Sequence, residues 1–99
     1  MYNGPWRIHW PLRVVAVAMA LGISLEEAES VFRQPGSVRS AWSLDGRDRL
    51  DVIGTTPGGK CLWLDVAPHH EDRILEVVDV SLLTEAEWAE VWRRVPSAG

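Results

Sequence analysis

Hydrophobic and polar positions follow strand-like patterns over Arg47–Val80, and we take this stretch as the centre of the fold. Three apolar runs lie within it: Leu50–Gly54, Cys61–Val66 and Ile74–Val80. The first four residues of the middle run are apolar at every position, a pattern typical of a strand that is covered on both faces. The middle run is therefore predicted to form the centre of a sheet.

Residues that favour turns separate these runs. Asp45–Gly46 is a strong signal for a two-residue hairpin. Pro57–Gly59 closes the next predicted hairpin, and Pro68–Asp72 closes the one after it. Upstream of the hairpins, Ser37–Leu44 alternates as a further strand, and Pro5–Trp10 alternates as a short one. The pattern predicts a meander of strands with the short strand added to it.

Capping residues mark three helices. Pro11 suits the first position of a helix, and the apolar period that follows predicts a helix ending at Gly22 as a left-handed cap. Ser24–Glu27 is a capping box that opens a second helix, which must end before Pro35, where Pro35–Gly36 is predicted to start a turn. Thr84–Glu87 is a second capping box and opens a C-terminal helix. The predicted order is β-α-α-β-β-β-β-α.

This order predicts an α+β fold. We expect a twisted, mainly antiparallel sheet of four to five strands, with two helices from the N-terminal half and a C-terminal helix packed on it. A chain of 99 residues fits one domain, so residues 1–99 are treated as a single domain with loose termini at residues 1–4 and 96–99. An apolar content of 46% with 24% charged residues argues against disorder.

Two further features bear on the compartment. The single cysteine, Cys61, excludes an intramolecular disulfide and fits a reducing compartment. The longest apolar stretch, Val14–Gly22, is shorter than the roughly twenty residues that a membrane-spanning helix needs. We expect a cytoplasmic protein that does not interact with membranes.

Charge and tryptophan content affect which partners we expect. Ten Lys and Arg against fourteen Asp and Glu give a net charge of −4, whereas nucleic-acid binders usually concentrate basic residues on their surface. An acidic set is either a solvated face or, if it forms one patch, a surface for a basic partner: Glu76, Asp79, Glu85, Glu87 and Glu90. A small core rarely buries six tryptophans completely. The Trp88/Trp92 stripe of the C-terminal helix is therefore either core or a docking surface, and exposed tryptophans would suit a homodimer.

The residues that could carry chemistry each have a structural alternative. Arg49 is either a cation that binds phosphate or a strand arginine paired with Asp51 or Asp65. His69–Asp72 lies at a predicted hairpin tip, where its histidines could act as acid or base near neutral pH or bind a metal, or where it could simply be polar. Closed metal sites need further ligands at defined spacing. We expect neither a metal nor a cofactor.

Four segments carry a family resemblance: Ile8–Trp10, Gly22–Pro35, Arg49–Gly54 and the helix start at Thr84. The second segment begins Gly-Ile-Ser-Leu-Glu-Glu-Ala and ends Val-Phe-Arg-Gln-Pro. It is similar to the Gly-Val-Ser/Asp-Phe-x-x-Ala and Val-Phe-x-x-Pro patterns of one family. Over residues 6–94 the chain resembles the BrnT-type toxins of bacterial toxin–antitoxin pairs, which belong to the RelE-like ribonuclease fold.

The resemblance implies a metal-independent endoribonuclease that acts on RNA and is neutralised by an antitoxin. The candidate site residues, taken from the residues themselves and from this resemblance, fall into three sets. The catalytic candidates are Arg49 and His70; the candidates that bind RNA phosphates are Arg47, Lys60, His69 and Arg73; and the candidates that bind a partner are Trp88, Trp92, Glu76 and Asp79.

The chain departs from the family at its basic positions. The last strand of the family reads Ile-Arg-Ile-Ile-Ser-Ala-Arg, but Leu75–Ser81 has lost both arginines and gained two acids. The Lys-His pair that precedes the family's first-helix glycine is Ala20–Leu21 here. RNA cleavage next to a 2′-hydroxyl needs a base, a cation and an acid, and Arg49 is the residue of the pattern that remains. The alternative hypothesis is a non-catalytic relative that binds another protein.

Overall fold

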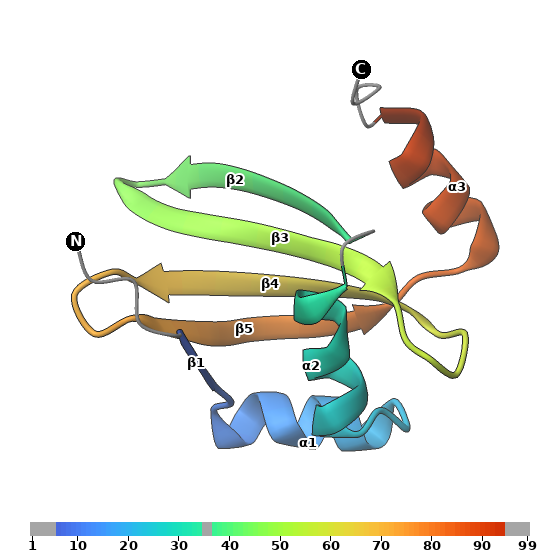
Figure 1. Cartoon of the computed structure of the whole chain (residues 1–99), viewed down its shortest axis with the longest axis horizontal. Coiled ribbons are helices and arrows are strands. Elements are labelled where there is room, and N and C mark those ends of the chain that lie inside the picture. Colours follow the sequence, from blue (N-terminus) through green and yellow to red (C-terminus); the bar gives the residue numbers. More distant parts are fainter. Residues whose placement is uncertain (1–5, 35–36, 95–99) are drawn as a thin grey trace.

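A computed structural model describes residues 6–34 and 37–94 (Figure 1). The predictions for the termini at residues 1–4 and 96–99, and for a turn at Pro35–Gly36, lie outside this range. The elements follow the predicted order and confirm the α+β class. They are β1 (Arg7–His9), α1 (Leu12–Ala20), α2 (Leu25–Arg33), β2 (Val38–Leu44), β3 (Arg47–Thr55), β4 (Cys61–His69), β5 (Ile74–Leu82) and α3 (Glu85–Arg94).

The strands form one five-stranded sheet in the order β1-β5-β4-β3-β2. β2 to β5 are an antiparallel meander, and β4 lies in the middle of the sheet as predicted. β1 pairs in parallel with the edge of β5, so that Arg7 lies opposite Ile74. Parallel neighbours need a long connection, and α1 and α2 lie between β1 and the meander in the chain.

Local backbone conformation explains the turns. Asp45 and Gly46 have φ of 51° and 75°, and two consecutive positive values are what a two-residue hairpin of type I′ requires. Arg73 also has a positive φ of 54° and precedes β5. The turn between β4 and β5 is shorter than the predicted Pro68–Asp72, because Pro68 lies inside β4 and pairs with Leu75.

The helices begin where the capping boxes predict. The backbone N–H of Glu27 donates to Ser24 Oγ over 3.1 Å, and the N–H of Ser24 donates to Glu27 Oε1 over 3.0 Å. The same reciprocal pair joins Thr84 and Glu87 at the start of α3, over 2.9 and 3.1 Å. Gly22, with φ of 74°, follows α1 as predicted.

One face of the sheet packs on α1 and α2, and we call it the front face. The core combines helix residues with strand residues: Val14, Ala18, Ile23, Ala28, Val31, Phe32, Val52, Leu62, Leu64, Val66, Val77 and Val80. Gly54 allows close packing of α2, since a Cβ added there would lie 2.8 Å from Val31 Cγ1. The opposite face is the rear face.

The rear face shows that the prediction of a central strand covered on both faces is wrong. Leu62 and Leu64 are fully buried against the front-face core, but Trp63 between them points to the rear face and is 41% exposed. β4 is therefore central in the sheet without being covered on both faces. The apolar run did not reveal this because an exposed tryptophan has the same apolar character as a buried one.

α3 is placed differently from the other helices. Figure 1 shows α3 beyond the end of the sheet, apart from α1 and α2. The core cluster of the described chain contains no residue of α3. Trp88 and Trp92 instead contact each other edge to face, with ring centroids 5.6 Å apart, and Trp92 is 45% exposed. The reading of these two tryptophans as core is therefore wrong.

Candidate functional site

β3 and β4 separate at one end of the sheet. They pair from Thr55 opposite Cys61 to Leu50 opposite Val66. Beyond that point Arg47–Arg49 pairs with β2, and Ala67–His69 pairs with β5. Two clefts adjoin this separation, one on each face, and both are lined by Asp48, Arg49 and Pro68. We call the separation and its two clefts the notch; Figure 1 shows the β2–β3 hairpin curving away from β4 there.

The rear cleft of the notch is rich in arginine. It has a volume of about 440 Å³ and is lined by Arg13, Arg47 and Arg49, together with His69 and Glu76. Arg13 reaches it from α1 and donates through Nη1 to the carbonyl of Val78 over 3.1 Å. Among the described residues its lining has three arginines against two carboxylates, those of Asp48 and Glu76, so the cleft is locally basic although the chain carries −4.

Arg47 and Arg49 differ in how they are held. The guanidinium of Arg47 makes no hydrogen bond or ion pair within the described chain. Arg49 Nη1 lies 2.8 Å from Asp65 Oδ2, and its guanidinium carbon lies 5.8 Å from the centre of the Trp42 ring. The Arg49–Asp65 pair is one of the pairings that the sequence allowed. It fixes the guanidinium at the rear side of the notch.

The two histidines lie on opposite sides of the notch, each with its Nε2 at a carboxylate. His69 Nε2 is 2.8 Å from Glu76 Oε1 in the rear cleft. His70 Nε2 is 3.3 Å from Asp48 Oδ2 in the front cleft. A carboxylate at one ring nitrogen orients the ring and favours the proton on that nitrogen. The Nδ1 atom of each ring is then available as an acceptor.

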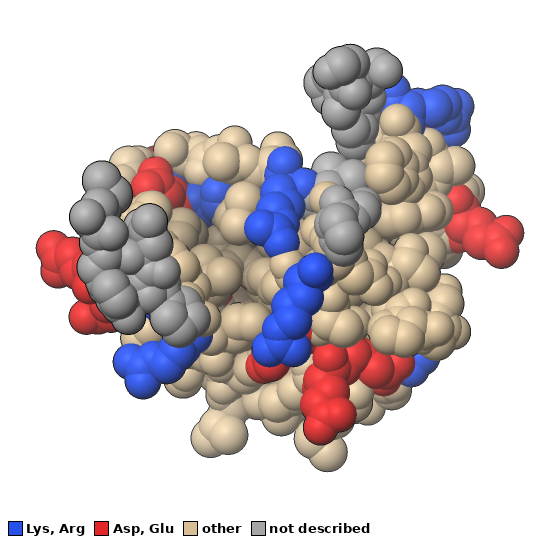
Figure 2. Space-filling view, in the orientation of Figure 1, with Lys and Arg blue, Asp and Glu red and all other residues tan. Residues whose placement is uncertain are grey.

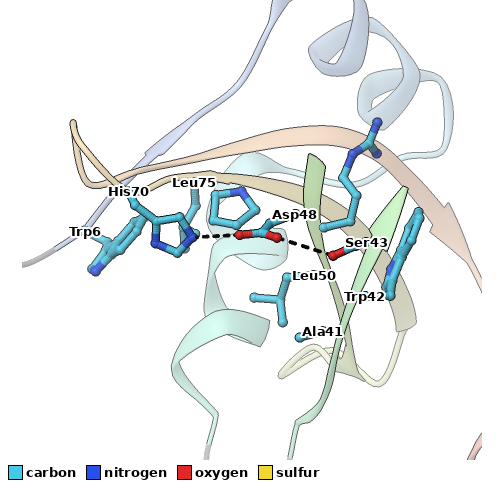
Figure 3. A pocket seen from close by; sticks show the side chains of 10 residues that line it. Trp6, Ala41, Trp42, Ser43, Asp48, Leu50, His70 and Leu75 are labelled. Atoms are coloured by element: carbon cyan, nitrogen blue, oxygen red, sulfur yellow. Dashed lines mark hydrogen bonds and ion pairs between the residues drawn. The ribbon is translucent and has the colours of Figure 1, made fainter. Parts of the chain in front are cut away.

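The front cleft is mostly apolar. It has a volume of about 480 Å³ (Figure 3). Its apolar lining consists of Trp6, Ala41, Trp42, Leu50, Pro68 and Leu75. Figure 3 shows Asp48 between His70 and Ser43, and Ser43 Oγ donates to Asp48 Oδ1 over 3.4 Å. Trp6 meets the His70 ring edge to face, with centroids 5.6 Å apart.

Lys60 lies at the other end of the sheet, just before β4. Its Nζ donates to the carbonyl of Gly22 over 2.7 Å and is 3.3 Å from Glu27 Oε2. The backbone N–H of Ser24 lowers the pKa of Glu27, and Lys60 lowers it further. Lys60 therefore joins the β3–β4 hairpin to the start of α2, and the structure does not bring it to the notch.

The remaining predicted residues are distributed over the sheet and α3. The backbone carbonyl of Arg73, in the turn before β5, accepts a hydrogen bond from Arg7 N over 3.0 Å. Glu76 lines the rear cleft, whereas Asp79 lies further along β5. Trp88 and Trp92 lie on α3. The structure thus groups Arg47, Arg49, His69, His70 and Glu76 at the notch and leaves the other predicted residues outside it.

Three aspartates form a row across the rear face. Asp51 lies directly opposite Asp65, and Asp65 lies directly opposite Asp79. Asp65 is paired with Arg49 through Oδ2, while its buried Oδ1 has no hydrogen-bond partner among the described residues. A hollow of about 230 Å³ lies between Trp63, Asp65, Asp79 and Ser81. Asp79 therefore belongs to this row, and Glu76, with which the sequence grouped it, belongs to the notch.

Sequence reasoning missed several residues that line the notch. Asp48 alternates with Arg47 and Arg49 along β3, and this alternation is the signal that could have placed it on the opposite face from the two arginines. Arg13 and Trp6 carry no such signal, because they reach the notch from segments far away in the sequence. Their positions follow from the parallel pairing of β1 with β5 and from the packing of α1 on β5.

Comparison with known protein families and with curated proteins found no match to this chain.

Within residues 6–34 and 37–94, no group of three or more His, Cys, Asp or Glu side chains is arranged to hold a metal ion. No helix in these ranges is long and apolar enough to cross a membrane.

Proposed function

We propose that this chain is the toxin component of a bacterial toxin–antitoxin pair and acts in the cytoplasm as a metal-independent endoribonuclease. The observation that supports this function is the convergence of Arg13, Arg47 and Arg49 with two carboxylate-bound histidines at the notch. Arginine is well suited to phosphate, because its planar guanidinium donates two parallel hydrogen bonds. Within the described chain the Arg47 guanidinium makes no hydrogen bond or ion pair that it would have to break to bind a phosphate.

The chemistry follows from these groups. An RNA phosphate lies against the arginines, and the neighbouring 2′-hydroxyl attacks it, so that the O2′–P bond forms and the P–O5′ bond breaks. One histidine accepts the proton of the 2′-hydroxyl, and the other donates a proton to the leaving 5′ oxygen. Each such proton transfer contributes about 10²- to 10⁴-fold to the rate. Arg49 and Arg47 stabilise the charge of the pentacoordinate phosphorus.

RNA cleavage by the purified chain tests this function. A labelled RNA of mixed sequence is incubated with excess protein in the presence of EDTA, and the expected products end in a 2′,3′-cyclic phosphate and a 5′-hydroxyl. Arg49→Ala and His70→Gln should each lower the rate by at least about 100-fold. Arg93→Ala is the matched control, because Arg93 lies on α3 with a 73% exposed side chain.

Two outcomes would contradict the function. A folded wild-type sample that leaves the RNA intact at excess protein would rule out the ribonuclease. Cleavage that continues unchanged in Arg49→Ala and His70→Gln would show that the activity does not come from the notch. The same RNA with 2′-deoxyribose at the cleaved positions must remain intact if the 2′-hydroxyl is the nucleophile.

A second function is a non-catalytic module that binds an antitoxin or another protein. The aspartate row and the exposed ring of Trp63 on the rear face favour it, since together they suit a basic segment of a partner. Expression in bacteria separates the two functions. Growth arrest by the wild type that Arg49→Ala relieves supports the ribonuclease. Harmless expression, together with a stable complex with the product of a neighbouring gene, supports the module.

Assembly of two copies is a related proposal. Trp88 and Trp92 lie on a helix outside the core, and Trp92 is 45% exposed. Sedimentation of the wild type and of Trp92→Ala would show whether this helix joins two copies. A monomeric wild type would exclude the homodimer.

A further inference from the structure

We infer that the front cleft of the notch binds the guanine base of the nucleotide whose 3′-phosphate lies at the arginines. This inference rests on the proposed action on RNA and adds the base that the site reads. Asp48 and Ser43 would be the residues that determine this specificity. Nothing in the sequence pattern pointed to this, because the front cleft is formed by residues of four strands, of the turn between β4 and β5, and of the segment before β1.

The front cleft and the rear cleft are parts of one site. Asp48, Arg49 and Pro68 line both clefts. The two clefts meet where β3 and β4 are no longer paired with each other. A single nucleotide placed in the notch can therefore extend from one cleft to the other, with its phosphate on the basic side and its base on the apolar side. The front cleft, at about 480 Å³, falls within the size range of small-molecule sites.

The lining of the front cleft suits a planar ring. Trp6, Leu50, Pro68 and Leu75 supply an apolar and aromatic wall. Proteins that read single-stranded RNA stack unpaired bases on aromatic side chains, as Trp6 could here, and form hydrogen bonds to the Watson–Crick edges of these bases. Figure 3 shows Asp48 between His70 and Ser43, as a polar group beside the apolar wall formed by Leu50, Leu75 and Ala41.

The order of donors and acceptors selects guanine. The Watson–Crick edge of guanine presents one acceptor, O6, next to two donors, N1–H and N2–H. An ionised carboxylate accepts two parallel hydrogen bonds, and a serine hydroxyl donates one. Asp48 with Ser43 therefore matches this edge, whereas adenine offers an acceptor at N1 where the carboxylate requires a donor.

The existing contacts of Asp48 allow this exchange. Its hydrogen bonds with Ser43 and His70 are long, at 3.4 and 3.3 Å, and its side chain is 59% exposed. Two carboxylate oxygens offer about four acceptor positions. Guanine can therefore bind to Asp48 while His70 keeps its orientation, and the Ser43 hydroxyl can turn to O6.

Binding of mononucleotides tests the inference without relying on catalysis. Guanosine 3′-phosphate, adenosine 3′-phosphate, inosine 3′-phosphate and inorganic phosphate are titrated separately into ¹⁵N-labelled protein, and Kd is measured from amide shifts. The guanine nucleotide should bind about tenfold more tightly than the adenine nucleotide, as expected for one bidentate base contact. Inosine, which lacks the N2 amino group, should lie between them, and inorganic phosphate should bind most weakly.

Variants assign the preference to residues. Asp48→Asn should abolish the difference between guanine and adenine, and Ser43→Ala should reduce it. Trp6→Leu should weaken the binding of the guanine and adenine nucleotides by a similar factor and leave the ratio of their Kd values unchanged. Glu26→Gln removes the same charge as Asp48→Asn from the exposed first turn of α2 and should change nothing.

Three results would overturn the inference: equal binding of guanine and adenine nucleotides, binding of inorganic phosphate as tight as that of the guanine nucleotide, and a guanine preference that persists in Asp48→Asn. If Asp48→Asn fails to fold, Ser43→Ala decides the matter on its own. Failure of the proposed function looks different. If the chain binds guanosine 3′-phosphate as described but does not cleave RNA, the inferred base site stands and the proposed ribonuclease function fails.

Discussion

Arg49 Nη1 lies 2.8 Å from Asp65 Oδ2 at the point where β3 and β4 begin to separate. Both side chains are about three-quarters buried, and Trp42 lies beside the guanidinium. The pair therefore has two effects. It neutralises one member of the aspartate row, and it holds an arginine at the rear side of the notch.

Removing Arg49 should destabilise the fold. Arg49→Ala leaves the Asp65 carboxylate partly buried without its counter-charge, and we expect a loss of about 1–2 kcal/mol in the free energy of unfolding. Urea denaturation measures this loss. The double variant with Asp65→Asn should recover most of it, because the unpaired charge is then gone. A double variant as unstable as Arg49→Ala alone would show that the pair does not account for the loss.

Removing Arg47 should weaken the proposed RNA binding and leave stability intact. Its guanidinium has no ion pair within the described chain, so Arg47→Ala should leave the urea midpoint unchanged. RNA binding should weaken, and the slope of log Kd against log salt should fall by about one, as for the loss of one phosphate contact. Fluorescence anisotropy at several salt concentrations measures the slope. An unchanged slope would place Arg47 outside the proposed RNA contact.

Neutralising one end of the aspartate row should stabilise the protein. Carboxylates directly opposite each other on neighbouring strands repel one another, so Asp79→Asn should raise the free energy of unfolding by about 0.2–1 kcal/mol. Asp72→Asn, in the turn between β4 and β5, removes the same charge away from the row and serves as the control. Equal gains in both variants would indicate a net-charge effect instead.

Adding a methyl group at Gly54 should be costly. The new Cβ would lie 2.8 Å from Val31 Cγ1 and 3.3 Å from Ser37 Cβ, so Gly54→Ala should push α2 away from β3 and cost about 1–3 kcal/mol. Gly58→Ala is the matched control, because its Cβ would have no neighbour closer than 3.9 Å. Thermal denaturation of the two variants should differ clearly. Similar melting temperatures would mean that α2 adjusts without cost.

The start of α3 should weaken in acid. The backbone N–H of Thr84 donates to Glu87 and lowers the pKa of that carboxyl below its ordinary value of 4.5. A carboxyl whose pKa is lower in the folded than in the unfolded state stabilises the fold at pH values above its unfolded pKa. This stabilisation is lost as the pH falls through the folded pKa. The Thr84 amide should therefore lose protection from hydrogen exchange below pH 4.5. Glu87→Gln should remove this pH dependence, while Glu85→Gln should leave it.

The sequence by itself determined the elements and most of their limits. The capping boxes at Ser24 and Thr84, the left-handed Gly22 and the Asp45–Gly46 turn act through local hydrogen bonds and backbone angles, and the structure has them as predicted. The alternation of Arg47, Asp48 and Arg49 along β3 also indicates which of these side chains share a face. These interactions join residues close together in the chain, which is why a sequence pattern contains them.

The tertiary structure alone decided which residues lie opposite each other and which surfaces are covered. The row of Asp51, Asp65 and Asp79 depends on the register of three strands, and a shift of one residue would turn each of them to the other face. The arrival of Arg13 at the rear cleft depends on how α1 packs on β5. The exposure of Trp63 and the position of α3 outside the core depend on which surfaces the helices cover. These features arise from contacts between residues distant in the chain, and a local pattern of apolar and polar positions does not specify them.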